Sequence, residues 1–292
     1  MKTLIPPLKI QGIKSKLVAH IKRHIVWDYK GMYFEPFMGS GVVGFNIAPK
    51  KAIFSDNNPH IINFYQAIQK DIINKDSIRA YLYEEGLILQ KDGQEHYLKI
   101  RERFNKHHNP FDFLFLNRSC FNGLMRFNSK GGFNVPYCKK DFRFSQSYIT
   151  KIANQVDWVS KLIKNNCYEF RTCDFIECLQ LAKNGDFIYC DPPYIDRHAD
   201  YFNTWNEKKE NELFCLLKAT KAQFMLSTWH SNQYRKNIYI DIFWRQFHSD
   251  IVEHFYHVGA SENNRNIIKE LLVRNYIINV NFMQDIQQKY LF

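Results

Sequence analysis

Short apolar runs alternate with helix-like patterns in the first and last parts of the chain. Residues 14–26 repeat apolar positions at helical spacing and place Leu17, Ile21 and Ile25 on one side of a helix. Seven short apolar runs predict strands, at residues 33–37, 52–55, 168–172, 186–190, 223–227, 252–256 and 270–277. Strands that alternate with helices predict an α/β fold, in which helices cover both faces of a sheet.

The middle of the chain interrupts this alternation. Residues 60–165 are mostly helical in pattern, so we expect an inserted domain between two parts of a first domain, residues 1–59 and 166–292. Within the insertion, residues 111–145 are rich in aromatic, asparagine, glycine and basic residues and almost lack acids. The string RFNSKGGFNVP predicts two short strands around a Ser-Lys-Gly-Gly turn, a β-hairpin within about residues 118–140.

Composition narrows the class of protein. The 292 residues include 40 Lys and Arg against 29 Asp and Glu, and the net charge of +11 favours a polyanionic partner. With 45% hydrophobic and 16% aromatic residues the chain is too apolar to be disordered. No apolar run approaches the roughly 18 residues of a membrane span. The seven cysteines form no CxxC pair, which predicts reduced thiols, no metal site and a soluble cytoplasmic protein.

A glycine turn follows the first predicted strand. The segment from Pro36 to Gly41 (PFMGSG) ends a strand and opens a helix, and ligands of open α/β sheets bind beyond such strand ends. Asp56, at the end of the next strand, could accept hydrogen bonds from a ribose. This arrangement is typical of nucleotide binding, although the fingerprint is not GxGxxG. A helix-starting turn without a ligand remains the alternative.

A second motif, Asp191-Pro192-Pro193-Tyr194, follows the buried run FIYC. The two prolines fix φ and lack N–H donors, so their carbonyls and the Asp191 carboxylate form a rigid set of acceptors. The Tyr194 ring can stack on a planar group. Several acceptors beside a stacking face suit an exocyclic amino group on a base. The lone pair of that amino nitrogen is delocalised into the ring, and it becomes available when both N–H groups donate hydrogen bonds to acceptors. A rigid Pro-Pro loop without catalytic function is the alternative.

The order of these motifs resembles one known family. An FxGxG turn followed by Asp-Pro-Pro-Tyr, with an insertion between them, is similar to the Dam-type DNA adenine-N6 methyltransferases (D12 class, alpha group) over about residues 6–276. Within the family the resemblance is to modification enzymes of the EcoRV type. It is carried by the strings PPLKIQGIKSKLV, FEPFMGSGVV, FLFLNRSCFNGLMRFNSKGGFNVPYCKK, YITKIANQVD, YCDPPYIDRHADYFNTW, STWHSNQYRKN and EHFYHVGASENNR.

The resemblance implies a fold and a reaction. The fold is a Rossmann-like S-adenosylmethionine-dependent methyltransferase sheet with an inserted, mostly helical DNA target-recognition domain that bears a β-hairpin. The methyl donor is S-adenosyl-L-methionine, the product S-adenosyl-L-homocysteine, and the substrate double-stranded DNA. An adenine flipped out of the duplex would receive the methyl group on N6.

The resemblance also assigns cofactor residues. Gly12 and Lys14 match the N-terminal GGK-like motif, whose lysine holds the methionine carboxylate. The family usually has W-x-G-G-K there, whereas this chain has Ile10-Gln11-Gly12-Ile13-Lys14, so donor contacts there differ in detail. The cofactor loop is matched by Phe37, Gly39 and Gly41, and the ribose-binding acid by Asp56. The pair that frames the adenine is matched by Asp174 and Phe175. The catalytic loop is matched by Asp191, Pro192, Pro193 and Tyr194.

Basic residues gather in the insertion and near the N-terminus. Phosphate contacts need such residues, and the cluster comprises Lys9, Arg118, Arg126, Lys130, Lys139, Lys140 and Arg143. Asparagines among them can pair with adenine edges; these are Asn117, Asn122, Asn128 and Asn134. An exposed phenylalanine could wedge into a base stack, but Phe127 and Phe133 fit a core better. A solvated charged surface is the alternative for the whole cluster.

By resemblance, several of these positions have defined roles toward DNA. Phe121 and Asn122 match residues that intercalate and contact the flipped region. Leu124, Arg126 and Pro136 match base-reading positions, and Lys9 matches a lysine that reads an outer guanine. Position alone suggests specificity roles for Lys139, Lys140 and Arg143. Arg197 and His198 follow the catalytic loop and could contact the flipped strand, or serve the structure.

The sequence therefore predicts a site-specific adenine DNA methyltransferase of the restriction-modification type. The EcoRV-type strings imply GATATC as the site. We also expect a monomer and a functional pairing with a cognate restriction endonuclease. The alternatives are the same chemistry at GATC, a methyltransferase acting on RNA or protein, and a DNA-binding regulator with a dead core. Asp191 argues against the protein-glutamine enzymes, which usually carry Asn-Pro-Pro-Tyr, and the intact motifs argue against a dead core.

Overall fold

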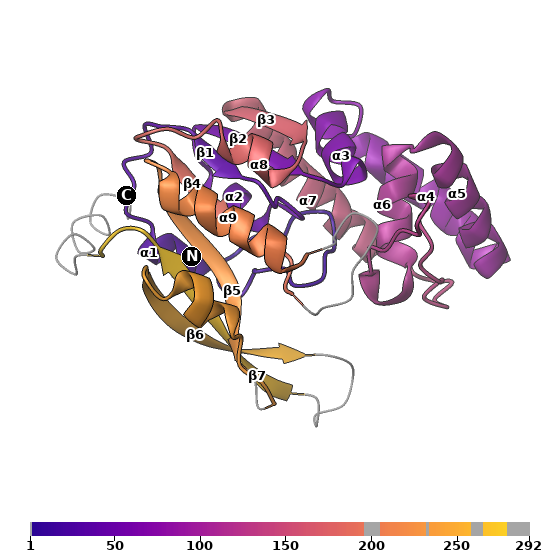
Figure 1. The fold of residues 1–292 in the computed structure, drawn as a ribbon. Coiled ribbons are helices and arrows are strands. Elements are labelled where there is room, and N and C mark those ends of the chain that lie inside the picture. The colour runs from indigo at the N-terminus through magenta and orange to yellow at the C-terminus, as the bar shows by residue number, and fades with distance from the viewer. Residues whose placement is uncertain (1, 196–204, 232–233, 258–264, 279–292) are drawn as a thin grey trace.

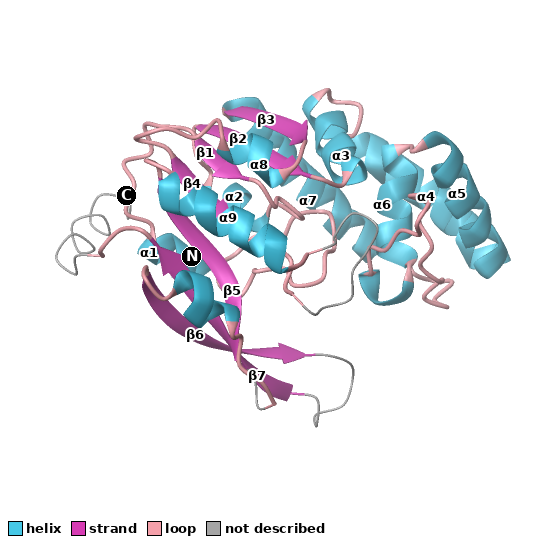
Figure 2. Cartoon of the chain, viewed as in Figure 1, coloured by secondary structure: helices cyan, strands magenta, loops and turns pink. Residues whose placement is uncertain are grey.

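A seven-stranded mixed sheet forms the centre of the molecule (Figures 1 and 2). The computed structural model describes residues 2–195, 205–231, 234–257 and 265–278. The strand order is β3-β2-β1-β4-β5-β7-β6, with β1 to β5 parallel and β7 antiparallel between β5 and β6. The strands are β1 Tyr33–Glu35, β2 Lys51–Asp56, β3 Cys167–Thr172, β4 Phe187–Cys190, β5 Gln223–Ser231, β6 His248–His257 and β7 Arg265–Arg274.

All seven strands coincide with apolar runs in the sequence, so the prediction of an α/β fold is confirmed. Every residue of β1 and β4 is buried, as expected for central parallel strands covered on both faces. The helices beside the sheet are α1 Val18–His24, α2 Val42–Ile47, α8 Phe175–Leu179, α9 Glu207–Ala219 and the π-helical turn Ile240–Trp244. The first helix is shorter than the predicted 14–26, because the chain becomes extended at Ile25.

Five further helices lie between β2 and β3 in the chain. They are α3 Pro59–Gln69, α4 Lys75–Asp92, α5 Gln94–His107, α6 Pro110–Ser119 and α7 Gln146–Asn165. Asn58, Asn74 and Asn109 cap the first, second and fourth of them by accepting backbone N–H groups. Figure 1 shows α4, α5 and α6 at the end of the molecule away from β6 and β7. No helix among the described residues is long and apolar enough to cross a membrane.

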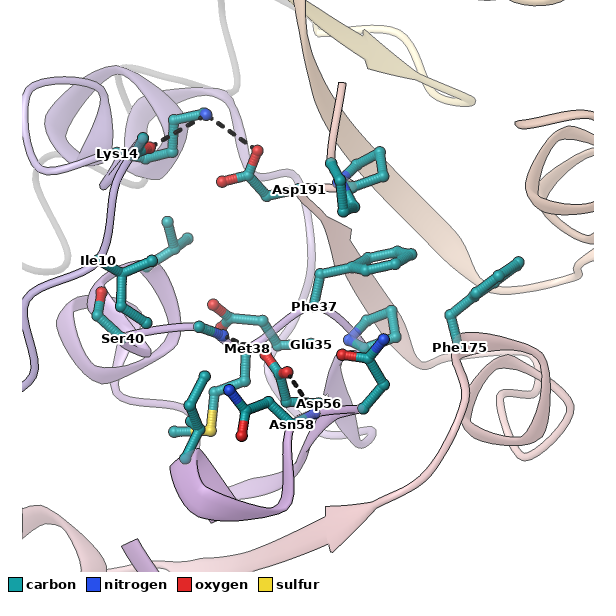
Figure 3. A pocket seen from close by; sticks show the side chains of 18 of the residues that line it. Ile10, Lys14, Glu35, Phe37, Met38, Ser40, Asp56, Asn58, Phe175 and Asp191 are labelled. Carbon is teal, nitrogen blue, oxygen red and sulfur yellow. Dashed lines mark hydrogen bonds and ion pairs between the residues drawn. The ribbon is translucent and has the colours of Figure 1, made fainter. Parts of the chain in front are cut away.

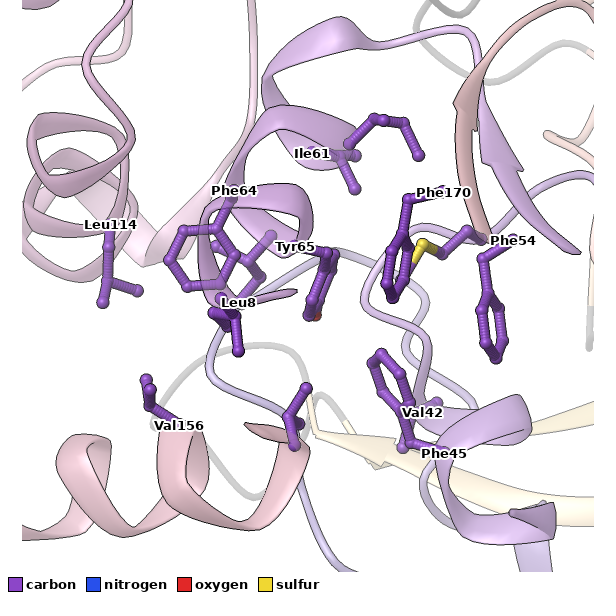
Figure 4. Packing of buried hydrophobic residues seen from close by; sticks show 14 of the residues in the cluster. Leu8, Val42, Phe45, Phe54, Ile61, Phe64, Tyr65, Leu114, Val156 and Phe170 are labelled. Carbon is purple, nitrogen blue, oxygen red and sulfur yellow. The ribbon is translucent and has the colours of Figure 1, made fainter. Parts of the chain in front are cut away.

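The inserted helices share a hydrophobic core with the sheet (Figure 4). Phe54 of β2 and Phe170 of β3 belong to the same buried cluster as Leu114 of α6 and Val156 of α7. Tyr65 of α3 stacks on Phe170 with ring centroids 5.7 Å apart. Because the packing is continuous, residues 60–165 are attached to the sheet through a broad contact. Their status as a separate domain remains a prediction.

The predicted hairpin has a looser structure than two strands. Its arms meet at two isolated antiparallel bridges, Cys120 with Tyr137 and Phe127 with Phe133. The turn is closed by the backbone bond from Asn128 N to the Gly132 carbonyl at 2.9 Å. Regular strands are absent from this described segment, which corrects the expectation. The phenylalanine pair is buried, as the core interpretation predicted, and each is at most 3% exposed.

A polar network joins three of the inserted helices. Asp112 of α6, 1% exposed, accepts from Arg103 of α5, 2.9 Å from Nε and 2.6 Å from Nη2, and from the Tyr81 hydroxyl of α4. Glu85 of α4 accepts from Arg103 Nη2 at 2.7 Å and lies 2.8 Å from His96 Nε2. A carboxylate buried this deeply needs such partners, so the network holds α4, α5 and α6 in one arrangement.

Replacement of Asp112 tests this network. Asp112→Ala should lower the free energy of unfolding by about 2 kcal/mol, because Tyr81 loses its acceptor while the half-exposed Arg103 can be rehydrated. Urea unfolding followed by circular dichroism measures the change. The control Lys99→Ala removes only an exposed pair with Glu95 on α5 and should leave the midpoint unchanged. Equal midpoints for the two variants would contradict a stabilising role for the network.

Candidate active site

The strand order reverses between β1 and β4, which are neighbours at the centre of the sheet. β1 continues to β2 on one side and β4 to β5 on the other, so a crevice opens at their carboxyl ends. A cavity of about 310 Å³ occupies this place (Figure 3). It is lined by residues from four strand ends and the N-terminal segment, including Gly12, Lys14, Glu35, Phe37, Gly39, Asp56, Asp174, Phe175, Asp191, Pro192, Pro193 and Tyr194.

The glycine turn after β1 forms one wall of the cavity. Gly39 and Gly41 have φ of +49° and +69°, a region that favours glycine. A Cβ on Gly41 would lie 2.5 Å from Cε2 of Phe45, so this glycine is required by packing as well as by conformation. The turn is held by bonds from Gly41 N to the Met38 carbonyl at 2.7 Å and from the Tyr65 hydroxyl to the Ser40 carbonyl at 2.6 Å.

Asp56 lies at the end of β2, beside this turn. Its Oδ2 accepts from Gly39 N and its Oδ1 from Asn58 N, both at 2.9 Å. Burial raises the pKa of Asp56 to about 6, although the two backbone hydrogen bonds oppose the shift. The carboxylate is thus oriented by the backbone and can still accept hydrogen bonds from a ligand at the cavity wall.

Aromatic rings form the opposite side of the cavity. Phe37 and Phe175 stack with centroids 5.5 Å apart, and Trp205 packs against them at 5.4 and 5.3 Å. Asp174 caps α8 by accepting from Ile176 N at 3.0 Å, which orients Phe175 at the first helical position. Trp205 also lines the cavity, and the sequence pattern alone gives no sign of this role, because only the fold brings Trp205 to this wall.

Lys14 is the most buried cation at the cavity, 4% exposed. Its Nζ pairs with Asp191 Oδ1 at 3.0 Å, donates to the Tyr194 hydroxyl at 2.9 Å and lies 3.3 Å from the Gly12 carbonyl. Burial by itself would lower the pKa of Lys14, but Asp191, Tyr194 and Glu270 outweigh it and raise the pKa well above its usual value. Lys14 therefore stays charged and binds the catalytic-loop candidates directly.

Asp191 and Tyr194 are further held by residues of β5 and β7. Ser227 Oγ donates to Asp191 Oδ1 at 3.0 Å, and Ser227 also lies 3.0 Å from the Tyr189 hydroxyl. Burial raises the pKa of Asp191, against the opposing effects of Lys14 and Ser227. The Tyr194 hydroxyl lies 2.8 and 3.0 Å from the two carboxylate oxygens of Glu270. The loop is thus held from two neighbouring strands, at Asp191 by β5 and at Tyr194 by β7.

Two buried acids at the site were not identified from the sequence. Glu35 accepts from the Tyr33 hydroxyl at 3.0 Å and from Gly44 N at 2.9 Å, and burial raises its pKa to about 8. An acid inside the apolar run YFEPF is a signal that could have drawn attention to it. Glu270 is 1% exposed on β7, about 76 residues beyond Tyr194, and only sheet pairing shows that they meet.

Several residues predicted to contact DNA are exposed. Phe121, 51% exposed, and Asn122, with φ of +54°, lie in the short 3₁₀ helix Phe121–Gly123. Leu124 is half-buried, and its neighbour Met125 lines the cavity, so this segment lies next to the catalytic-loop candidates. The other exposed members are Arg126, Asn128, Pro136, Lys139 and Lys140.

Other members of the set serve the structure. Arg118 is 3% exposed and donates to the Pro7 carbonyl and to Gln155 Oε1 at 2.7 Å, so it lacks the exposure that a phosphate contact requires. Arg143 donates to the Arg118 carbonyl at 2.7 Å and lies over the Tyr148 ring at 4.5 Å. The backbone N–H and carbonyl of Lys9 both bond to the Asn117 amide at 2.8 Å.

Besides Asn117, two further asparagines of the set have intramolecular partners. Asn128 Oδ1 accepts from the backbone N–H groups of Lys130 at 2.9 Å and Gly132 at 3.0 Å, which shapes the turn. Asn134 Oδ1 accepts from Arg126 Nε at 2.9 Å. To read a base, either side chain would therefore have to give up these intramolecular hydrogen bonds in exchange for hydrogen bonds to DNA. Arg197 and His198 lie outside the described residues.

Comparisons with known proteins agree with this geometry. The family model for D12 class N6 adenine-specific DNA methyltransferases matches residues 11–268. The type II methyltransferase M.MjaIII of Methanocaldococcus jannaschii is 30% identical over 80% of this chain and 87% of its own. The type II methyltransferase M1.LlaDCHI of Lactococcus lactis subsp. cremoris is 28% identical over 94% of this chain and 96% of its own.

A DNA adenine methylase of Haemophilus influenzae is 32% identical over 80% of this chain and 82% of its own. Among solved structures, an rRNA methyltransferase from Streptomyces viridochromogenes aligns with a TM-score of 0.38 at 12% identity, over 89% of this chain and 83% of that one. A likeness at that level carries no argument. The family match spans both the cavity and the inserted helices, and the chain belongs to the D12 class of N6 adenine-specific DNA methyltransferases, which use S-adenosylmethionine.

Proposed function

We propose that the chain methylates N6 of an adenine flipped out of duplex DNA, at a defined site, with Asp191-Pro192-Pro193-Tyr194 as the catalytic loop. The observation that carries the proposal is the position of this loop. It leaves β4 at the point where the strand order reverses and shares one cavity with the glycine turn and Asp56. Acceptors for an amino group and a site for a nucleoside-like donor are thus adjacent.

The residues of the cavity fit S-adenosylmethionine. Asp56 presents an oriented carboxylate for ribose hydroxyls, and the stacked rings of Phe37 and Phe175, with Asp174, offer an apolar wall against which the adenine can lie. Gly39 and Gly41 bring backbone close to the ligand, and Lys14, with the turn at Gly12, supplies a buried cation for a carboxylate. The volume of about 310 Å³ lies at the lower end of the range for small-molecule sites. When bound, the cofactor supplies a methyl group on a positively charged sulfur.

The catalytic loop then acts on the exocyclic amine of the base. Asp191 and the Pro192 carbonyl accept its two N–H groups, which reduces delocalisation of the lone pair into the ring and lets the nitrogen attack the methyl carbon. The carbon–sulfur bond would break as the new bond forms, leaving a neutral thioether, and the methylated nitrogen would then release one proton to solvent. Ser227 and Lys14 orient the Asp191 carboxylate, and the Tyr194 ring stacks on the base. No covalent enzyme intermediate is needed, so catalysis consists mainly of orientation and electrostatic placement.

We also propose that the DNA site is GATATC, on the EcoRV-type strings, with GATC as the alternative. Phe121 and Asn122 are exposed, as an intercalating pair must be, and Lys9, Leu124, Arg126 and Pro136 are the proposed base-reading residues. Lys139 and Lys140 are exposed and suit phosphate contacts. We propose further that the protein is a monomer that acts on DNA in the cytoplasm. It would be functionally paired with a restriction endonuclease of the same specificity.

Mapping of modified bases tests the reaction and the site together. Expression in a bacterial host that lacks adenine methylation, followed by sequencing of native DNA, should reveal N6-methyladenine at GATATC. Modification at GATC or elsewhere would retain the chemistry and reject the proposed specificity. Unmodified DNA from cells that contain folded, cofactor-binding protein would reject the proposed function and direct attention to RNA or protein substrates.

Substitution of Asp191 tests the catalytic loop. Asp191→Ala should lower the rate of methyl transfer by at least about 100-fold, because the principal acceptor for the amino group is lost. Binding of a DNA duplex, measured by fluorescence anisotropy, should change by less than about threefold. As a control, Asp157→Ala removes a partly exposed partner of the exposed Lys161 on α7 and should methylate normally. Near-normal turnover by the Asp191 variant would refute the mechanism.

The raised pKa of Asp56 predicts a pH dependence of cofactor binding. Ribose hydroxyls donate to the ionised carboxylate, so binding is strong above the pKa of about 6 and weakens as protonation removes the acceptor. The Kd for S-adenosylhomocysteine should rise by about tenfold from pH 7 to pH 5. Asp56→Asn should bind weakly with a flat profile in this range, because it does not titrate. Parallel profiles for the two proteins, by calorimetry, would exclude Asp56 as the cause.

A further inference from the structure

Glu270 is a buried acid that the catalytic proposal does not use. It lies on β7, the antiparallel strand between β5 and β6, opposite Trp229 of β5, and it is 1% exposed. Lys269, the preceding residue, pairs with Glu253 of β6 at 2.8 Å. Successive side chains of a strand point to opposite faces, so Glu270 points away from that exposed pair.

The Tyr194 hydroxyl is held between Glu270 and Lys14. It donates to the Glu270 carboxylate, whose oxygens lie at 2.8 and 3.0 Å, and it accepts from Lys14 Nζ at 2.9 Å. An ammonium group can only donate, so the Tyr194 oxygen accepts from Lys14 and its single proton is left for Glu270. With Pro193 fixing the chain before it, the ring is held at its backbone and at its hydroxyl.

Glu270 also shares the charge of Lys14. Its Oε1 lies 3.8 Å from Lys14 Nζ, and Asp191 Oδ1 lies 3.0 Å from the same nitrogen. One buried ammonium thus faces two carboxylates. If Asp191 turns its lone pairs to an amino group, Lys14 retains an anionic partner in Glu270. Without Glu270, Asp191 would be the only protein carboxylate beside Lys14 among the described residues. An unpaired buried charge is strongly unfavourable, so Lys14 would then hold Asp191 more tightly.

We propose that Glu270 is a positioning residue for methyl transfer, which orients the Tyr194 ring for stacking and leaves Asp191 available to the base. This inference rests on the proposed function, since it gives Tyr194 and Asp191 the roles stated there. Glu270 touches neither the base nor the cofactor in this scheme. It acts through the hydroxyl of Tyr194 and, secondarily, through its charge toward Lys14.

The test is a double-mutant cycle between Glu270 and Tyr194, read in single-turnover methyl transfer to a duplex that carries the mapped motif. Glu270→Ala should lower the rate about 10- to 100-fold, because a loosened ring misplaces the base. KM for DNA should change by less than about threefold. In a Tyr194→Phe background, which lacks the hydroxyl, the same change should cost less than about threefold, since the shared interaction is already lost.

The conservative variant and a neighbouring acid complete the design. Glu270→Gln keeps an oxygen that accepts from Tyr194, so it should retain at least about a third of the rate. Glu253→Ala removes the exposed acid of the adjacent strand and should match the wild type. Thermal unfolding of each variant confirms folding, and Glu270→Gln provides the comparison if Glu270→Ala does not fold.

The outcomes separate this inference from the proposed function. Equal losses from Glu270→Ala in both Tyr194 backgrounds, or a Glu270→Gln rate as low as that of a folded Glu270→Ala, would overturn the positioning role. A Glu270→Ala enzyme with wild-type rate would also overturn it while leaving the proposed function intact. A wild-type protein that methylates no adenine would reject the proposed function itself.

Discussion

The buried ammonium of Lys14 is the interaction on which the arrangement of the site depends. It joins the N-terminal segment to the loop after β4 through Asp191 and Tyr194, and to strand β7 through Glu270. Two carboxylates in a buried cluster would repel each other without a cation between them. The ion pair offsets that repulsion, and it keeps the Asp-Pro-Pro-Tyr loop beside the cavity instead of exposed to solvent.

The rest of the molecule supports this cluster through rigid contacts. Tyr65 of α3 bonds to the glycine turn at Ser40, so the inserted helices contact the cavity wall directly. Asn117 of α6 bonds to both backbone groups of Lys9, only five residues before Lys14. The exposed segment at Phe121 follows the same helix. Elements proposed to read DNA are therefore connected to the catalytic cluster by short paths of packed and hydrogen-bonded groups.

Residue type alone did not separate DNA-facing side chains from structural ones in the insertion. Arg118 and Arg126 occur in the same basic, asparagine-rich stretch, yet the first is 3% exposed and the second lies on the surface. Arg118 is buried because Pro7 and Gln155 supply acceptors from distant parts of the chain. Phe127 and Phe133 pair beside the turn of the predicted hairpin, and regular strands do not form around them.

Local patterns in the sequence determined the strands, the inserted helices and the two loop motifs. Buried parallel strands read as short apolar runs, and glycines with positive φ or paired prolines restrict the backbone wherever they occur. The tertiary structure decided which distant groups meet. Glu270 joins the site because β7 pairs antiparallel with β5, and Ser227 reaches Asp191 from β5. Such partners depend on strand order and register, which arise from packing of the whole sheet and leave no mark at the residues themselves.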